Sequence, residues 1–187
     1  MTLIALGLIL WTLGHSFGRI APDLRQRLGD PGKGVAAVVI FAGLGLMIWG
    51  YRTADFVPLW SPGDGLWPVN NLMMLVAVYF YAVSGARTAL ATKLRHPMLW
   101  GTVIWGVAHL LVNGDAASVL LFGGMTAWAL LTRWTINRAQ PDWVAPTRPG
   151  VGKESGVAAI SIVVFVVFSL IHGWIGPDPI WTGWHGG

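Results

Sequence analysis

The chain has 187 residues, of which 55% are hydrophobic and only 11% are charged, and its mean hydropathy is +0.62. Soluble domains usually carry about 25% charged residues, so this composition indicates a membrane protein and argues against a soluble domain. The chain contains no cysteine, which excludes disulfides, thiolate metal ligands and covalent haem attachment through a Cys-x-x-Cys-His motif.

Six apolar runs predict an all-α bundle of six transmembrane helices, forming one transmembrane domain over residues 1–187. The runs cover residues 2–18, 34–51, 68–90, 97–112, 116–132 and 156–175. Arg19 follows the first run and no charged side chain precedes it, which is the reverse of a signal peptide, so we expect this run to stay as a helix. Between the fourth and fifth runs, Asn113, Gly114 and Asp115 predict a tight turn in which Asp115 caps the next helix.

Basic residues predict the orientation of these helices. Eleven of the twelve Lys and Arg residues fall within 19–33, 87–95 and 133–153, which are alternate connections between the runs, and only Arg52 lies elsewhere. Short loops rich in Lys and Arg stay on the cytoplasmic side, where they face anionic lipid. We therefore expect a multi-pass protein with both termini on the periplasmic side. The pI of about 10.0 then needs no nucleic-acid partner.

Histidines are the main chemical signal within the apolar runs, because ionisable residues in membrane spans are costly and usually functional. His15, His109 and His172 lie in the runs, His96 at the start of the fourth run, and His185 near the C-terminus. The runs contain no carboxylate or thiolate. A metal there would be held mainly by imidazole, which suits haem iron, copper or zinc.

The positions of these histidines leave more than one ligand pair open. His96 and His109 are 13 residues apart on one helix, about 20 Å along its axis, so they cannot bind a single iron. Depth in the bilayer favours pairing His109 with His172, and His15 with His96. A tilted first helix would instead bring His15 towards His109.

The helical face of His109 carries further polar groups. A single histidine within a span often hydrogen-bonds across helices and binds no metal. Thr102 and Asn113 share the face of His109, and we treat both as candidates for orienting its imidazole beside a cofactor.

Four sequence blocks resemble the NnrU family. They are Leu13–Phe17 (LGHSF), Arg95–Gly101 (RHPMLWG), Trp105–Asp115 (WGVAHLLVNGD) and Ser118–Gly123 (SVLLFG). The third block is the most specific, and the resemblance extends to the helix that carries His172. The family groups bacterial proteins linked to denitrification with the plant 15-cis-zeta-carotene isomerase, a haem b membrane enzyme.

The resemblance implies haem b bound in the bacterial inner membrane, with His15 and His109 as the first candidates for iron ligands. It also implies a role in nitrogen-oxide metabolism, or in haem-dependent isomerase or redox chemistry. A carotenoid or a quinone would be the apolar small-molecule partner. A mechanism that exchanges an axial histidine for cysteine is excluded, because the chain has no cysteine.

Two other functions are open at this point. The element Arg95-His-Pro-x-x-x-Gly101 also resembles the RHPxYxG element of membrane methyltransferases, although Leu99 replaces the tyrosine and no glutamate follows within a span. Gly14 and Gly18 form a small-xxx-small face of the kind that packs against another helix. Such a face would suit a non-catalytic accessory subunit of a larger membrane complex.

Overall fold

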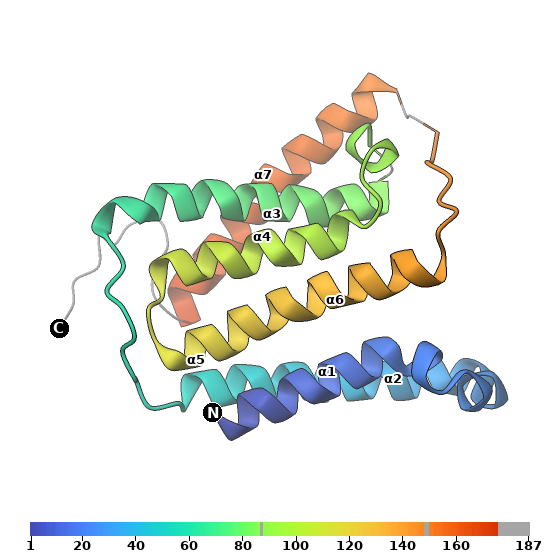
Figure 1. Cartoon of the computed structure of the whole chain (residues 1–187). Coiled ribbons are helices and arrows are strands. Elements are labelled where there is room, and N and C mark those ends of the chain that lie inside the picture. The colour runs from blue at the N-terminus through green and yellow to red at the C-terminus, as the bar shows by residue number, and fades with distance from the viewer. Residues whose placement is uncertain (87, 148–149, 176–187) are drawn as a thin grey trace. The chain divides into compact units, whose positions relative to one another are not determined.

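The computed structural model describes residues 1–86, 88–147 and 150–175, and the regular secondary structure among these residues is helical, with no strand (Figure 1). The longer helices are α1 (Thr2–Ile20), α2 (Pro22–Arg52), α3 (Trp67–Ala86), α4 (Pro97–Val112), α6 (Gly124–Ala139) and α7 (Val151–Ile175). The shorter elements are η1 (Asp64–Leu66), η2 (Leu90–Thr92), α5 (Ala116–Ser118) and the π-helical turn η3 (Val119–Gly123). Arg87, Arg148 and His185 lie outside the described residues.

Several of these helices are suited to a membrane, as the apolar runs predict. Because α5, η3 and α6 follow one another without a break, they form one helix over Ala116–Ala139. This helix and α1, α2, α3 and α7 are the five that are long and apolar enough to cross a membrane. The α4 helix is a shorter apolar helix. An all-α protein with several helices of membrane-spanning length is therefore confirmed.

The chain divides into two compact units. The first contains residues 1–60 and 114–125, and the second contains residues 61–113 and the chain from 126 onwards.

In the first unit, α1 and α2 lie side by side (Figure 1). They approach each other closely at glycines. A Cβ atom added to Gly43 would lie 2.8 Å from the backbone oxygen of Gly7 and 2.8 Å from the backbone nitrogen of Trp11. A Cβ on Gly14 would lie 2.6 Å from the side chain of Ile40. The small-residue face expected on the first helix is thus used, at Gly14, for packing within this unit.

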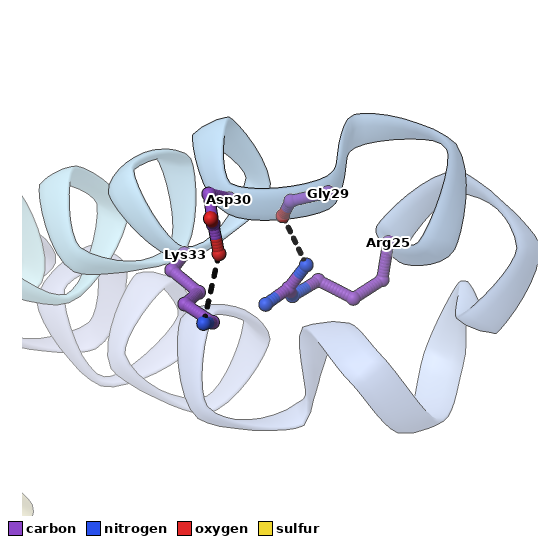
Figure 2. A network of polar contacts seen from close by, with 4 residues as sticks. All are labelled: Arg25, Gly29, Asp30 and Lys33. Carbon is purple, nitrogen blue, oxygen red and sulfur yellow. Dashed lines mark hydrogen bonds and ion pairs between the residues drawn. The ribbon is translucent and has the colours of Figure 1, made fainter.

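The segment before the second apolar run is helical, although its charge predicted a connection between spans. The α2 helix contains a kink at Gly29, whose φ of 55° and ψ of −132° suit glycine. Arg25 Nη1 donates to the Gly29 carbonyl oxygen at 2.6 Å, and Lys33 pairs with Asp30 at 2.9 Å (Figure 2). Pro31 falls in the first turn after the kink, where its missing N–H removes no helical hydrogen bond.

The turn that follows α4 has the cap that the sequence predicts. Asp115 is the N-cap of α5, and its Oδ1 accepts from the Ser118 backbone N–H at 3.0 Å. Gly114 accepts from the backbone N–H groups of Leu59 and Trp60 at 2.7 and 3.0 Å. A Cβ on Gly114 would overlap the Trp60 carbonyl oxygen, so only glycine fits this close approach.

In the second unit, α3 packs against both α4 and α7 (Figure 1). Tyr81 near the end of α3 bonds to Thr102 near the start of α4, with 3.0 Å between the oxygen atoms. Val83 of α3 packs in a buried cluster with Val157 near the start of α7. These contacts show that α4 and α7 both run antiparallel to α3.

The helix ends in this unit follow local signals. The α4 helix has the bounds of the fourth apolar run, with His96 as its N-cap and Pro97 in its first turn. The α3 helix ends at Ala86, short of the run to residue 90, where η2 forms instead. The α7 helix begins at Val151, before the apolar run at 156.

Candidate cofactor site

A cavity of about 620 Å³ lies within the second unit, between α3, α4 and α7. Its α3 residues are Trp67, Asn70, Asn71, Met74, Val78, Tyr81 and Ala82; its α4 residues are Trp105, His109, Val112 and Asn113; and its α7 residues are Ser161, Val164, Phe165, Phe168, Ser169 and His172. The spacing of three or four residues places each set on one helical face. Small-molecule sites usually measure about 300–1,000 Å³ and are mostly apolar with a few polar groups, as this cavity is.

Several polar groups of this cavity gather at one end. Asn70 precedes Tyr81 by 11 residues on α3, and Asn113 follows Thr102 by the same number on antiparallel α4. At 1.5 Å per residue both lie about 16 Å from the Tyr81–Thr102 bond, in the same direction. His172 lies at a corresponding level on α7, because that helix also runs antiparallel from its contact at Val157. We call the end with Asn70, Asn113 and His172 the polar end; Tyr81 and Ser161 are further polar residues that line the cavity away from it.

His109 stands at the polar end with its ring orientation fixed from its own helix. Its Nδ1 donates to the Trp105 carbonyl oxygen at 2.9 Å, since that oxygen can only accept. The two rings lie 5.1 Å apart between centroids, at an interplanar angle of 50°. A proton on Nδ1 leaves the lone pair of the neutral imidazole on Nε2, the tautomer that binds a metal through Nε2.

Two of the other predicted site residues, His172 and Asn113, line the same cavity as His109. Asn113 caps α4, because its Nδ2 donates to the His109 carbonyl oxygen at 2.8 Å. It thus holds the backbone of His109 and not its ring. Depth in the bilayer predicts His109 and His172 as a pair, and both residues line this one cavity.

Thr102 lies beside the cavity without lining it. It is buried, its hydroxyl donates to the Met98 carbonyl oxygen at 3.2 Å, and it pairs with the Tyr81 hydroxyl at 3.0 Å. Tyr81 does line the cavity. Thr102 therefore positions a cavity residue on α3, Tyr81.

His96 occupies a different place in the second unit. It has a left-handed backbone, with φ of 97°, and its Nε2 donates to Asn137 Oδ1 at 2.9 Å. Nearby, the Arg133 guanidinium lies 4.6 Å from the ring centroid of Trp100. His96 does not line the cavity, so the Arg95-His-Pro element that resembles a methyltransferase motif is separate from it.

His15 lies in the first unit and repeats the local geometry of His109. Its Nδ1 donates to the Trp11 carbonyl oxygen at 2.9 Å, and the two ring centroids are 4.3 Å apart. His172 likewise follows an aromatic residue, Phe168, by four positions. An aromatic residue four positions before a histidine is a sequence signal that accompanies all three in-span histidines.

Several cavity residues were not predicted from the sequence. Asn70, Tyr81, Ser161 and Ser169 line the cavity, and each is a polar residue inside an apolar helix. Their spacing on α3 and α7 matches one helical face, so in-span polarity combined with period 3.6 was the available signal. What the sequence lacks is the information that these two faces meet α4.

The cavity offers two imidazoles, those of His109 and His172, as candidate metal ligands. Among the described residues, no three His, Cys, Asp or Glu side chains come together in a way that could hold a metal ion. A zinc site normally needs three or four protein ligands. Haem iron receives four nitrogens from the porphyrin and needs one or two from the protein, which His109 and His172 would provide.

The fold and the cavity together define an all-helical protein with several helices of membrane-spanning length and an amphipathic, histidine-containing cavity. The family model described as NnrU protein matches residues 3–179. The chain therefore belongs to the NnrU family, as the four sequence blocks indicate. No curated protein and no solved structure matches it.

Proposed function

We propose that the protein binds haem b in the cavity of the second unit, where His109 and His172 would hold its iron. The observation that carries this proposal is that both residues line one cavity of about 620 Å³. The hydrogen bond to Trp105 supports it, because it sets the metal-binding tautomer of His109. Membership of the NnrU family supports it as well.

The surroundings of His109 would serve a planar cofactor. Trp105, Phe165 and Phe168 contribute aromatic walls, and Met74 and Val78 close the apolar body. Bound haem would supply an iron centre whose chemistry depends on the axial ligands: two histidines favour electron transfer, and one open position permits gas binding or substrate chemistry. The residues of this chain orient the His109 imidazole and keep the site apolar.

The biological role that we propose follows the family. We propose that the protein takes part in nitrogen-oxide metabolism, or in haem-dependent isomerase or redox chemistry. It would do so in the bacterial inner membrane, with both termini on the periplasmic side. A carotenoid or a quinone is the proposed apolar partner. Gly14 does not support an accessory-subunit role, because this residue packs against α2 within its own unit.

The test is an absorption spectrum of the protein purified in detergent from cells supplied with ample haem. We expect a Soret band in the wild type, loss of most of it in His109→Ala, and a shifted or weakened band in His172→Ala. His96→Asn is the matched control and should keep the band, because His96 lies away from the cavity.

Two results would change this assignment. Loss of the band in His15→Ala, with the band intact in His172→Ala, would make His15 the second ligand. A wild-type protein without a Soret band would refute haem binding.

A further inference from the structure

The start of α4 and the end of α6 are joined by two pairs of side chains at one end of the second unit (Figure 1). In one pair, His96 Nε2 is hydrogen-bonded to Asn137 Oδ1 at 2.9 Å. In the other, the Arg133 guanidinium lies 4.6 Å from the ring centroid of Trp100. The two partners on each helix are four residues apart and share one helical face. None of these four residues lines the cavity.

Arg133 carries a charge that no acidic residue balances. It makes no ion pair and no hydrogen bond with the part of the chain that the structure describes, and its Nε atom is buried without a partner. The first turn of α4 and the last turn of α6 contain no acidic residue. Burial lowers the pKa of His96, and the nearby charges of Arg95 and Arg133 lower it further. Two guanidinium groups therefore lie close to one imidazole.

The position of Arg133 along its helix makes this charge costly. It precedes the last residue of α6 by six positions, about 9 Å along the axis, within a helix long and apolar enough to cross a membrane. Ionisable side chains in a span normally pair with an opposite charge or reach towards the headgroups. The contact with Trp100 stabilises the guanidinium but brings no negative charge. An anion from outside the chain would complete this site.

The surface next to Arg133 indicates what carries the anion. Leu130 lies one turn closer to the middle of α6 and is 42% exposed, and Leu131 is 62% exposed. An acyl chain would cover these side chains, whereas a soluble phosphate would leave them bare. An indole ring beside the cation is typical of the headgroup zone. The charge, the indole and the apolar surface together fit a phospholipid whose chains run along α6.

We infer that Arg133, held against Trp100 and assisted by Arg95, binds the phosphate of an anionic phospholipid of the phosphatidylglycerol type. A phosphodiester offers two acceptor oxygens, and a guanidinium presents N–H groups that can bind them as a pair. A choline headgroup is disfavoured, because its own positive charge would meet two guanidinium groups. This lipid site is separate from the cavity and does not depend on haem.

Competition between two lipids with identical acyl chains, phosphatidylglycerol and phosphatidylcholine, tests this assignment. Equal amounts are added to the full-length protein in an uncharged detergent. Native mass spectrometry then compares the two complexes that contain one lipid per protein. We expect the wild type to favour phosphatidylglycerol roughly tenfold, as for one charge-assisted contact.

Variants of α6 distinguish a specific site from the general effect of charge. In Arg133→Gln we expect the preference to fall to about twofold, the residual effect of exposed charges. Arg133→Lys keeps the charge but loses the planar donor pair, and should show a preference of about threefold. Arg138→Gln is the matched control, because Arg138 also lies over an indole, 5.1 Å from the Trp134 centroid, but is exposed. This control should keep the wild-type preference.

Equal binding of the two lipids by the wild type would overturn the inference. An equal reduction in Arg133→Gln and Arg138→Gln would also do so, because net charge alone would then explain the preference. If Arg133→Gln does not fold, a wild-type preference in Arg133→Lys would refute the guanidinium site.

Glycerophosphoglycerol, the same headgroup without acyl chains, distinguishes a lipid from a soluble phosphodiester. We expect bound phosphatidylglycerol to remain in place when this compound is added in about tenfold excess, because it cannot cover the apolar surface of α6. Displacement of the lipid would show that the site takes a soluble anion and would refute the lipid as its occupant.

Discussion

At the scale of single residues, two of the in-span histidines, His15 and His109, share the same local arrangement. A backbone carbonyl one turn earlier accepts from Nδ1 in both His15 and His109, and a tryptophan ring lies against each imidazole. This arrangement uses only the helix that carries the histidine. It therefore fixes the tautomer before any other helix packs, and its effect is encoded entirely by local sequence.

His96 differs from these residues, and it leads to a prediction about pH. Burial lowers the pKa of His96; the hydrogen bond to Asn137 opposes this, and the positive charges of Arg95 and Arg133 add to it. The folded protein then keeps His96 neutral at pH values where the unfolded chain already binds a proton. The contribution of His96 to the free energy of unfolding is complete above about pH 6.5 and is lost as the pH falls through the lowered pKa.

The variant His96→Asn isolates this effect. Asparagine tolerates the left-handed backbone of this position and is a good N-cap, so the fold is retained. We expect the loss of stability between pH 7.5 and pH 5, measured by denaturant unfolding in detergent, to be smaller in the variant than in the wild type. Equal losses in the two proteins would show that His96 does not contribute.

At the scale of helices, the close approach of α1 and α2 depends on glycine at Gly43. In Gly43→Ala the new Cβ meets backbone atoms of α1, which cannot rotate away as a side chain can. We expect the free energy of unfolding in detergent to fall by about 1–3 kcal/mol, the usual cost of overpacking.

Gly45 provides the control for this experiment on the same helix. A Cβ on Gly45 would meet nothing within 4 Å. Gly45→Ala should leave stability unchanged or raise it by up to about 1 kcal/mol, because alanine favours helix. A similar loss of stability in both variants would show that the close contact of α1 and α2 at Gly43 does not determine the result.

The helices also show what sequence reasoning could reach. The bounds of α4 follow from Pro97 at its start and Asn113 at its end, both of which act locally. The helical segment before Gly29 was not predicted, because its charges and glycines are typical of a loop. There, the Arg25 side chain donates a hydrogen bond to the Gly29 carbonyl oxygen at the end of this helical segment. Residue propensities do not predict such a bond.

For the cavity, the sequence identified the residues with distinctive chemistry and missed those that matter by position. His109, His172 and Asn113 were predicted because ionisable and amide groups are rare in spans. Asn70 became visible only once α3 lay against α4 and α7. Its place in the cavity lining is a property of the packed unit and cannot be read from a single helix.

At the scale of the whole molecule, the absence of cysteine makes the proposed orientation simple to test. Single cysteines replace exposed residues in two connections, Asp55→Cys and Lys93→Cys. We expect a membrane-impermeant maleimide to label Asp55→Cys in cells with a permeabilised outer membrane, and Lys93→Cys only after lysis. The charge distribution is the physical reason, since basic loops stay in the cytoplasm.

The wild-type chain reports the background directly, because it has no thiol to react. Labelling of Lys93→Cys before lysis, with protection of Asp55→Cys, would invert the proposed orientation. It would leave the cavity and its residues unaffected.

The length of α4 has a consequence for the lipid around it. Its 16 residues extend about 24 Å, whereas the hydrocarbon layer of a bilayer is about 30 Å thick. Such hydrophobic mismatch is relieved by local thinning of the bilayer or by drawing polar helix ends inwards. His109 lies only about 4.5 Å from the end of this helix, so in a membrane-spanning α4 the thickness of the bilayer would control how much water its imidazole meets.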